Sequence, residues 1–380
     1  MYNVLTLNKI AACGTDLLDK SKYTVSDDEK NPDAILVRSA SMHEMELPGN
    51  LLAIARAGAG VNNIPIDKCT EKGVVVFNTP GANANAVKEL VIAGLLLSSR
   101  KIPAAMDWIK TLKGKGDEVG KLVEKGKSQF VGPEIMGKKL GVIGLGAIGI
   151  LVANAAAELG MDVYGADPYL SVENALKLSG KVHYVKSNKE IFEKCDYITL
   201  HVPALPDTKG MINAEAIASM KKTVRLLNFA RDTLVDEKAI IDALANGGMA
   251  CYVTDFATDG LIGLDGVVAM PHLGASTPES EDNCAVMAAD ELISYIERGE
   301  VKNSVNLPEL TPPAEFEKRV CIIYKDSDGV RENIVAALGG NITSLNSAAK
   351  NGLGYLVCDT PNPDSERITA VSGVVRMRII

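Results

Sequence analysis

Four side chains that could take part in catalysis lie within a few residues after predicted strands in the second half of the chain. They are Arg231, Asp255, Asp259 and His272. In an open sheet of parallel strands, ligands bind at the carboxyl ends of the strands. A histidine there can accept the proton of a carbinol as a hydride leaves, while a carboxylate orients the ring and stabilises its charged form. An arginine can bind a substrate carboxylate through two parallel hydrogen bonds. Together these residues predict hydride-transfer chemistry.

A glycine-rich turn supplies a candidate cofactor site for that chemistry. Gly144, Gly146 and Gly149 have the spacing G-x-G-x-x-G, between an apolar strand and an alanine-rich helix at 151–159. Glycines at this spacing allow a tight turn, a close approach to a pyrophosphate and close packing of helix on strand. The amino end of the helix then presents free N–H groups to the phosphates.

An acidic residue at the end of the next predicted strand indicates which dinucleotide is bound. Asp167 follows the strand 162–166, close to the spacing of about 20 residues after the glycines that is typical of a ribose-binding acid. Pro168, Tyr169 and Leu170 follow it, so no neighbouring cation would hold a 2′-phosphate. The sequence therefore favours NAD over NADP.

The elements that must position these residues alternate between strands and helices. This pattern predicts a Rossmann-type doubly wound parallel sheet inserted into a flavodoxin-like substrate domain, with a small α+β domain at the C-terminus. The expected domains are 1–96 with 284–310 (substrate), 97–283 (NAD) and 317–380 (small domain). Helices are expected at 84–99 and 281–298, and strands at 34–37, 51–55, 74–77, 162–166, 197–201, 225–228, 250–254 and 267–270.

Composition restricts the class of protein. The 380 residues are 47% hydrophobic and 23% charged, as in ordinary globular proteins, and the net charge of −8 argues against nucleic-acid or anionic-membrane partners. The longest apolar run, 90–97, is far short of a membrane span.

The seven cysteines form no C-x-x-C pair, and the first segment predicts a strand; both features favour a cytoplasmic protein. The four histidines are not at ligand spacing from cysteines, so no metal site is expected. The lysine-rich segment 101–130 predicts a solvated arm or helix; the alternatives are a dimer contact and a contribution to binding an anionic substrate.

Several motifs, in order along the chain, resemble those of the D-2-hydroxyacid dehydrogenase family, and within it the branch that acts on 3-phosphoglycerate. They are the glycine turn, His201-Val202-Pro203 with Thr208, Asn228-Phe229-Ala230-Arg231, and the segment 271–277. The segment 319–380 resembles an ACT domain. The resemblance implies that His272 is the general base and that Arg231 anchors the substrate, with Asp259 as the acid that pairs with His272.

The same resemblance implies two binding sets. The substrate set is Arg38, Ser39, Ala59, Gly60, Asn83, Arg231 and His272. The cofactor set, for NAD, is Gly144, Gly146, Ala147, Ile148, Gly149, Asp167, His201, Val202, Pro203, Thr208, Phe229, Ala230, Asp255, His272 and Gly274.

The chain departs from the family pattern at several positions. The family's glutamate that pairs with the histidine would fall at Gly260, so Asp259, one residue earlier, is the expected substitute. Asp232 replaces a usual glycine, and Ala40 lies where related enzymes often have a second phosphate-binding arginine. In the ACT-like segment the family's serine-contacting histidine and asparagine correspond to Tyr324 and Asp326, while Asn341 matches.

The function expected from the resemblance is NAD-dependent oxidation of 3-phospho-D-glycerate to 3-phosphohydroxypyruvate by a cytoplasmic homodimer or homotetramer. The alternatives are oxidation or reduction of another 2-hydroxy acid, such as glycerate/hydroxypyruvate or glyoxylate, and an NADH-sensing regulator on the same fold. The substrate is expected to be a small phosphorylated 2-hydroxy acid. Deletion of residues 312–380 is expected to leave the catalytic chemistry largely intact.

Overall fold

A five-stranded parallel sheet is built by the first eighty residues of the chain. In this computed structural model, which describes residues 1–380, its order is β2-β1-β3-β4-β5. The strands are β1 (Tyr2–Leu7), β2 (Tyr23–Ser26), β3 (Ala34–Val37), β4 (Ala53–Arg56) and β5 (Val75–Asn78). The predicted strands are confirmed here. Central strands such as β3 are buried at every position, because helices cover both faces of a parallel sheet.

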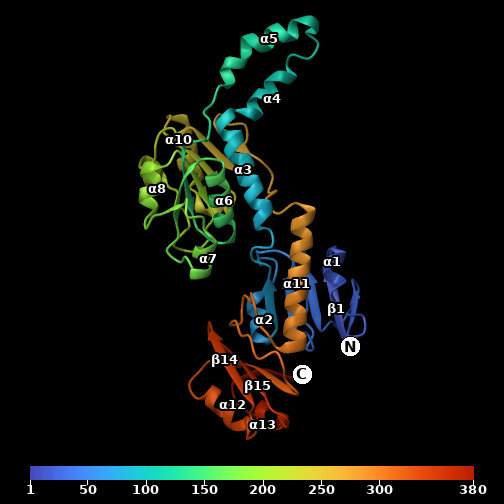
Figure 1. The fold of residues 1–380 in the computed structure, drawn as a ribbon. Helices are drawn as coiled ribbons and strands as arrows, with labels where there is room; N and C mark the ends of the chain where they lie inside the picture. Colours follow the sequence, from blue (N-terminus) through green and yellow to red (C-terminus); the bar gives the residue numbers. More distant parts are fainter. The chain divides into compact units, whose positions relative to one another are not determined.

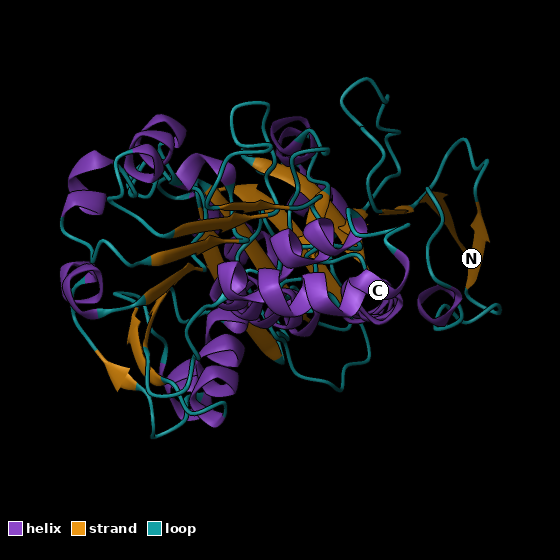
Figure 2. Cartoon of the chain, turned by 90° about the horizontal axis from the view of Figure 1, so that it is seen from above, coloured by secondary structure: helices purple, strands orange, loops and turns teal.

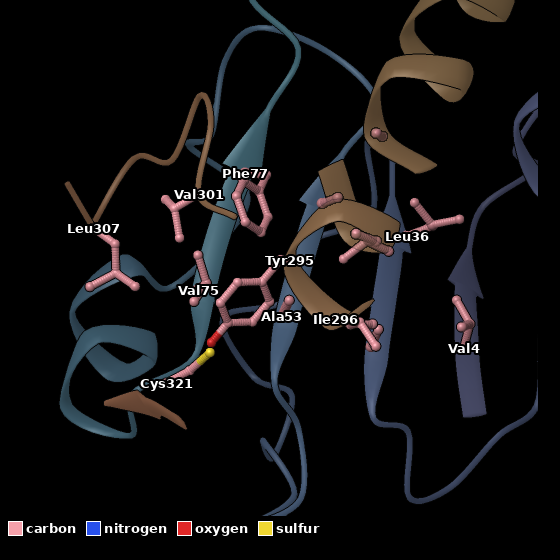
Figure 3. Close-up of a cluster of buried hydrophobic side chains, with 14 of the residues drawn as sticks. Val4, Leu36, Ala53, Val75, Phe77, Tyr295, Ile296, Val301, Leu307 and Cys321 are labelled. Atoms are coloured by element: carbon pink, nitrogen blue, oxygen red, sulfur yellow. The ribbon is translucent and has the colours of Figure 1, made fainter. Parts of the chain in front are cut away.

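Helix α11 (Pro278–Arg298) returns to this sheet from much later in the chain and completes its core. Figure 3 shows Tyr295 and Ile296 of α11 against Phe77, Ala53 and Leu36 of the sheet. The shorter helices α1 (Ala12–Thr15) and α2 (Ile66–Glu71) complete this part, and α1 packs on α11.

A second parallel sheet is built by the middle of the chain, in the order β12-β11-β10-β9-β6-β7-β8. The chain enters this sheet at the interior strand β6, adds β7 and β8 on one side, and then adds β9 to β12 on the other, which is the predicted doubly wound topology. Figure 2 shows the strands of the chain (orange) with helices (purple) beside them. The strands are β6 (Lys139–Ile143), β7 (Asp162–Ala166), β8 (His183–Tyr184), β9 (Tyr197–Leu200), β10 (Arg225–Asn228), β11 (Cys251–Thr254) and β12 (Val267–Ala269).

Side-chain caps define the amino ends of several helices around this sheet. The hydroxyl of Ser187, for example, accepts a hydrogen bond from the Lys189 amide at the start of α8. Ser171, Asn213 and Asp236 cap α7, α9 and α10 in the same way. The helices are α6 (Ala147–Glu158), α7 (Val172–Lys177), α8 (Asn188–Lys194), α9 (Ala214–Ala218) and α10 (Glu237–Ala245), with the 3-10 turn η3 (Asp232–Leu234).

Helix α3 (Ala84–Arg100) belongs with this second sheet. Its residues Val87, Val91 and Leu95 are buried against α6 and the strands β10 and β11. The chain therefore divides into residues 1–83 with 278–380 and residues 84–277. The divisions fall at 83/84 and 277/278 instead of the expected 96/97 and 283/284, because α3 and α11 pack along their whole length within one unit each.

The segment 101–130 forms two amphipathic helices joined by a turn. They are α4 (Ile102–Lys110) and α5 (Val119–Gly126), with the 3-10 turns η1 (Gly116–Glu118) and η2 (Lys127–Phe130). Figure 1 shows α4 following α3 and turning back through α5. No residue of α4 or α5 is buried. The rings of Trp108 and Phe130 contact each other, with their centroids 5.3 Å apart.

The C-terminal segment has the predicted strand-helix-strand-strand-helix-strand order and forms an antiparallel sheet, β14-β15-β13-β16 (red in Figure 1). The strands are β13 (Arg319–Lys325), β14 (Ser344–Lys350), β15 (Leu353–Asp359) and β16 (Val374–Ile379), and the helices are α12 (Val330–Leu338) and α13 (Ser365–Thr369). The two helices cover one face, where Ile334 and Ile368 pack against Ile322.

The other face of this sheet is part of the core around α11. Cys321, Ile323 and Tyr355 are buried in the same cluster as Tyr295 of α11. The Tyr355 hydroxyl donates a 2.7 Å hydrogen bond to the carbonyl of Gly299, just past the end of α11. The small domain expected at 317–380 thus shares a core with the first sheet. Deleting it would expose that apolar face, which is expected to lower the stability of the truncated protein; the prediction that its catalytic chemistry stays largely intact remains a prediction.

Candidate functional site

The β6–α6 turn has the backbone geometry that a dinucleotide phosphate requires. Gly144 has φ +94°, and a Cβ there would lie 2.5 Å from the carbonyl oxygen of His201. A Cβ on Gly149 would overlap the carbonyl oxygen of Gly144, whereas the space beside Gly146 is open. No side chain caps the amino end of α6, where Ala147 and Ile148 form the first turn. Its N–H groups are therefore available to an anion.

Asp167 connects the end of β7 to this turn. Its Oδ2 accepts a 2.8 Å hydrogen bond from the Leu145 amide, and its Oδ1 accepts one from the Tyr169 amide at the same distance. The carboxylate is therefore held beside the glycine turn, where it could accept hydrogen bonds from ribose hydroxyls.

The predicted cofactor residues after β9 form an ordered loop. Nε2 of His201 lies 3.0 Å from the Thr199 hydroxyl, and burial lowers the pKa of His201 to about 3, so its ring is neutral at pH 7. The Thr208 hydroxyl donates to the Pro203 carbonyl at 2.6 Å and accepts from the Leu205 amide. Thr208 thus fixes the loop that begins with Val202 and Pro203.

Three of the predicted catalytic side chains are brought together at the carboxyl ends of β10, β11 and β12. Asp255 interacts electrostatically with both His272 and Arg231. The His272 ring contacts the Phe256 ring, with centroids 5.0 Å apart. Arg231 and His272 are exposed, whereas Asp255 is 2% exposed. A cation, a histidine and a buried acid therefore share one edge of the sheet.

Burial dominates the electrostatics of Asp255. It raises the pKa of this carboxyl, and the positive fields of His272 and Arg231 offset the shift in part. Gly274 is buried beside it, and a Cβ on Gly274 would lie 3.5 Å from Oδ2.

Asp259, the expected partner of His272, is exposed, and no hydrogen bond or ion pair joins the two residues. At the neighbouring Gly260, a Cβ would lie 2.6 Å from Oε1 of Glu237. The side chain of Glu237, the first residue of α10, therefore occupies the space that a side chain at position 260 would need.

Asn228 belongs to a motif named in the sequence but was not among the predicted site residues. It is fully buried at the end of β10, where its Nδ2 donates to the Arg231 carbonyl at 2.9 Å and its Oδ1 accepts from the Ala230 amide. These bonds shape the turn that carries Arg231. Phe229 turns inward, against Gly94 of α3, so its side chain belongs to the core. The available signal was an asparagine at the end of a buried strand, three residues before the predicted arginine.

The predicted substrate residues of the first sheet lie at the carboxyl ends of three adjacent strands. Arg38 and Ser39 follow β3, Ala59 and Gly60 follow β4, and Asn83 lies in the segment after β5. The Ala59 carbonyl accepts a hydrogen bond from Nδ2 of Asn78. These positions match the edge at which ligands bind in parallel sheets.

Two further residues missed by the sequence reasoning hold the Arg38 segment. Nη2 of Arg38 lies 2.6 Å from Oε1 of Glu281 in the first turn of α11. Oδ1 of Asn8 accepts hydrogen bonds from the amides of Ser39 (3.0 Å) and Ala40 (2.6 Å). Asn8 also lines a cavity of about 690 Å³ at the ends of β1 and β2. A left-handed asparagine after a strand, with φ +70° here, is recognisable only in the structure.

No helix is both long and apolar enough to cross a membrane. No group of three or more histidine, cysteine, aspartate or glutamate residues is arranged to hold a metal ion.

Comparison with known proteins identifies the class to which this fold and site belong. Residues 92–274 match the family model described as D-isomer specific 2-hydroxyacid dehydrogenase, NAD binding domain. The chain is 30% identical to D-3-phosphoglycerate dehydrogenase of Haemophilus influenzae, in an alignment covering 98% of this chain and 94% of that protein. The chain belongs to the D-2-hydroxyacid dehydrogenase family and carries its NAD-binding domain.

Within the family, the similar curated proteins are named D-3-phosphoglycerate dehydrogenase. The Bacillus subtilis protein is 34% identical over 84% of this chain and 61% of its own length. The chain thus spans about three-fifths of that relative. The crystal structure of 3-phosphoglycerate dehydrogenase from Entamoeba histolytica with NAD+ bound aligns with a TM-score of 0.64 at 27% identity, over 81% of this chain and 99% of that one.

Proposed function

We propose that this protein catalyses NAD-dependent oxidation of 3-phospho-D-glycerate to 3-phosphohydroxypyruvate, the entry step of serine synthesis. The observation that carries the proposal is the grouping of Arg231, Asp255 and His272 at the carboxyl edge of a sheet with an open G-x-G-x-x-G turn. The names of the relatives from Haemophilus influenzae and Bacillus subtilis support the substrate.

The residues have separate tasks in this reaction. His272 accepts the proton of the substrate's 2-hydroxyl group, and its exposed ring can reach a ligand. Arg231 binds the carboxylate in a planar, bidentate arrangement, held in place by the bonds from Asn228. The α6 amino end and Asp167 would hold the pyrophosphate and ribose of NAD, which when bound accepts the hydride.

The phosphate of the substrate is assigned to Arg38 and Ser39. The amides of Ser39 and Ala40 are already occupied by Asn8, so the Arg38 guanidinium and the Ser39 hydroxyl remain the candidate donors to phosphate. Arg38 is 40% exposed in its side chain and so can reach a ligand beside its bond to Glu281.

A second candidate substrate is an unphosphorylated 2-hydroxy acid such as glycerate or glyoxylate. The pairing of Arg38 with Glu281 favours it, because this carboxylate partly neutralises the guanidinium and repels a phosphate. Ala40 adds no second positive charge at this position.

One experiment separates the two candidates. NADH formation, and its reverse with the 2-oxo acids, is measured for 3-phosphoglycerate, glycerate, glycolate and lactate with the parent protein and with Arg38→Met. The proposal expects the highest kcat/KM for 3-phosphoglycerate, and a loss in Arg38→Met that is confined to the phosphorylated substrate. Equal losses on both kinds of substrate, or a preference for glycerate, would contradict it.

We also propose a cytoplasmic homodimer or homotetramer, with an ACT-like C-terminal domain. Support for association comes from α4, where Met106 (58% exposed) and Ile109 (43%) leave apolar surface in water. Sedimentation of the parent and of Met106→Glu/Ile109→Lys tests this. A smaller assembly is expected for the variant, and the proposed contact fails if the sedimentation coefficient is unchanged.

A further inference from the structure

The carboxylate of Asp255 is buried without a side-chain hydrogen bond. The residue is 2% exposed, and neither Oδ1 nor Oδ2 has a well-aligned hydrogen-bond partner, although the amides of Gly274 and of Asp255 itself approach the carboxylate. An unpaired buried carboxylate is costly, and such groups persist in proteins where a ligand or a moving side chain satisfies them. Asp255 directly follows β11, at the edge of the sheet where the other catalytic candidates lie.

The groups that face this carboxylate come from three elements. His272 follows β12, Arg231 follows β10, and both interact electrostatically with Asp255. Gly274 closes the space on the side of Oδ2. Phe256, the next residue after Asp255, packs its ring on the ring of His272 at 5.0 Å and an interplanar angle of 54°. The acid and the histidine are thus placed together by adjacent strands.

The His272 ring has no hydrogen bond in this structure, and its residue is exposed. Catalytic hydrogen bonds are often long or misaligned without ligands and tighten when the ligand binds. Because the His272 side chain is exposed, its ring is free to rotate toward the buried carboxylate when a ligand binds.

We propose that Asp255, and not Asp259, is the positioning residue that orients the His272 ring and stabilises its protonated form. The inference rests on the proposed dehydrogenase function. Gly260 carries no side chain that could pair with the histidine, and Asp259 is exposed without a bond to His272. The nearby Glu237 fills the space beside Gly260 and has its own electrostatic neighbour in Tyr252.

The test compares Asp255→Asn with Asp259→Asn as the matched control from the same loop. Asparagine is nearly isosteric, and a neutral amide is less costly to bury than a charge, so both variants are expected to fold. The measurements are kcat/KM between pH 6 and 10 with the preferred 2-hydroxy acid, and NADH affinity from fluorescence. For Asp255→Asn the proposal expects kcat to fall at least about tenfold and the acidic limb of the profile to move to lower pH. NADH affinity should stay within about threefold.

Two results would overturn the proposal. The first is a displaced profile in Asp259→Asn together with an unchanged profile in Asp255→Asn. The second is a loss of NADH affinity in Asp255→Asn that matches the loss of activity while the pH profile is retained, because Asp255 would then serve the cofactor alone.

A measurement made without substrate tests the pairing of Asp255 with His272 separately from the proposed dehydrogenase activity. In protein labelled with nitrogen-15 histidine, ring shifts at alkaline pH report which nitrogen carries the proton, and His272→Gln assigns its signals among four histidines. A single tautomer in the parent and in Asp259→Asn, with a mixture in Asp255→Asn, supports the pairing even if every 2-hydroxy acid fails as a substrate. The same tautomer population in all three proteins contradicts the pairing even if the dehydrogenase activity is found.

Discussion

The guanidinium of Arg38 and the carboxylate of Glu281 form a 2.6 Å ion pair between the end of β3 and the first turn of α11. Their side chains are 40% and 43% exposed, so the pair contributes little to stability. Its importance lies in the charge that it presents to an anionic ligand.

Glu281→Gln is expected to lower KM for the phosphorylated substrate several-fold with little change for an unphosphorylated one. Glutamine keeps the size of the side chain but removes a negative charge beside the proposed phosphate position. Steady-state kinetics with both substrates measure this, and Glu279→Gln, an exposed position in the same turn, is the control. A rise in KM for the phosphorylated substrate would mean that Glu281 orients Arg38 productively.

His272→Gln is expected to lower kcat by about 10² to 10⁴. Glutamine can form hydrogen bonds but cannot accept the hydroxyl proton, so NADH binding should persist while the chemistry is lost. Rates come from NADH absorbance and binding from NADH fluorescence, with exposed His183→Gln as the control. A kcat within a few-fold of the parent would assign His272 a structural role.

Arg231→Lys is expected to be nearly as damaging to kcat/KM as Arg231→Ala. A single ammonium group cannot reproduce two parallel hydrogen bonds to a carboxylate. Kinetics of both variants with the preferred substrate decide the point. Full activity in Arg231→Lys would exclude the bidentate model.

Asp167→Asn tests the role of the Asp167 charge in cofactor preference. The asparagine oxygen can still accept the Leu145 amide that Asp167 now binds at 2.8 Å, so the glycine turn is retained. Losing the charge removes repulsion of a 2′-phosphate, and the ratio of kcat/KM for NAD over NADP should fall. Asp162→Asn, at the start of β7, is the control. A parent protein that uses both cofactors equally would contradict the assignment.

The stability of the first unit is expected to depend on pH through Glu291 of α11. Burial raises the pKa of this carboxyl to about 8, while Asn303 donates a 2.8 Å hydrogen bond to it. Between the ordinary value of 4.5 and about 8 the native state holds a proton that the unfolded chain has released. The contribution of Glu291 to stability is therefore present below pH 4.5 and decreases as pH rises toward 8.

Thermal unfolding between pH 5 and 9 tests this dependence. In Glu291→Gln, which cannot ionise, Tm should decrease less with rising pH than in the parent. Glu279→Gln, at an exposed position in the first turn of the same helix, should keep the parent slope. Parallel curves for the parent and Glu291→Gln would show that Glu291 is already ionised in the folded protein at neutral pH.

Local sequence patterns determined the order of elements and the cofactor turn. The spacing of Gly144, Gly146 and Gly149 is sufficient, because the three glycines satisfy steric requirements within one turn and its helix. The buried strands were recognisable for a similar reason, since a strand covered on both faces is apolar throughout. The strand-helix alternation then restricts the topology to a doubly wound sheet.

Only the tertiary structure decided which side chains face one another. Asp255 and Asp259 are equivalent in sequence as acids after β11, yet one is buried beside His272 and the other is exposed, because the chain turns outward between them. Glu281 meets Arg38 only after α11 has returned to the first sheet across more than two hundred residues. The C-terminal sheet shares its core with α11 for the same reason. Such contacts depend on long-range packing, and no local pattern of residues records them.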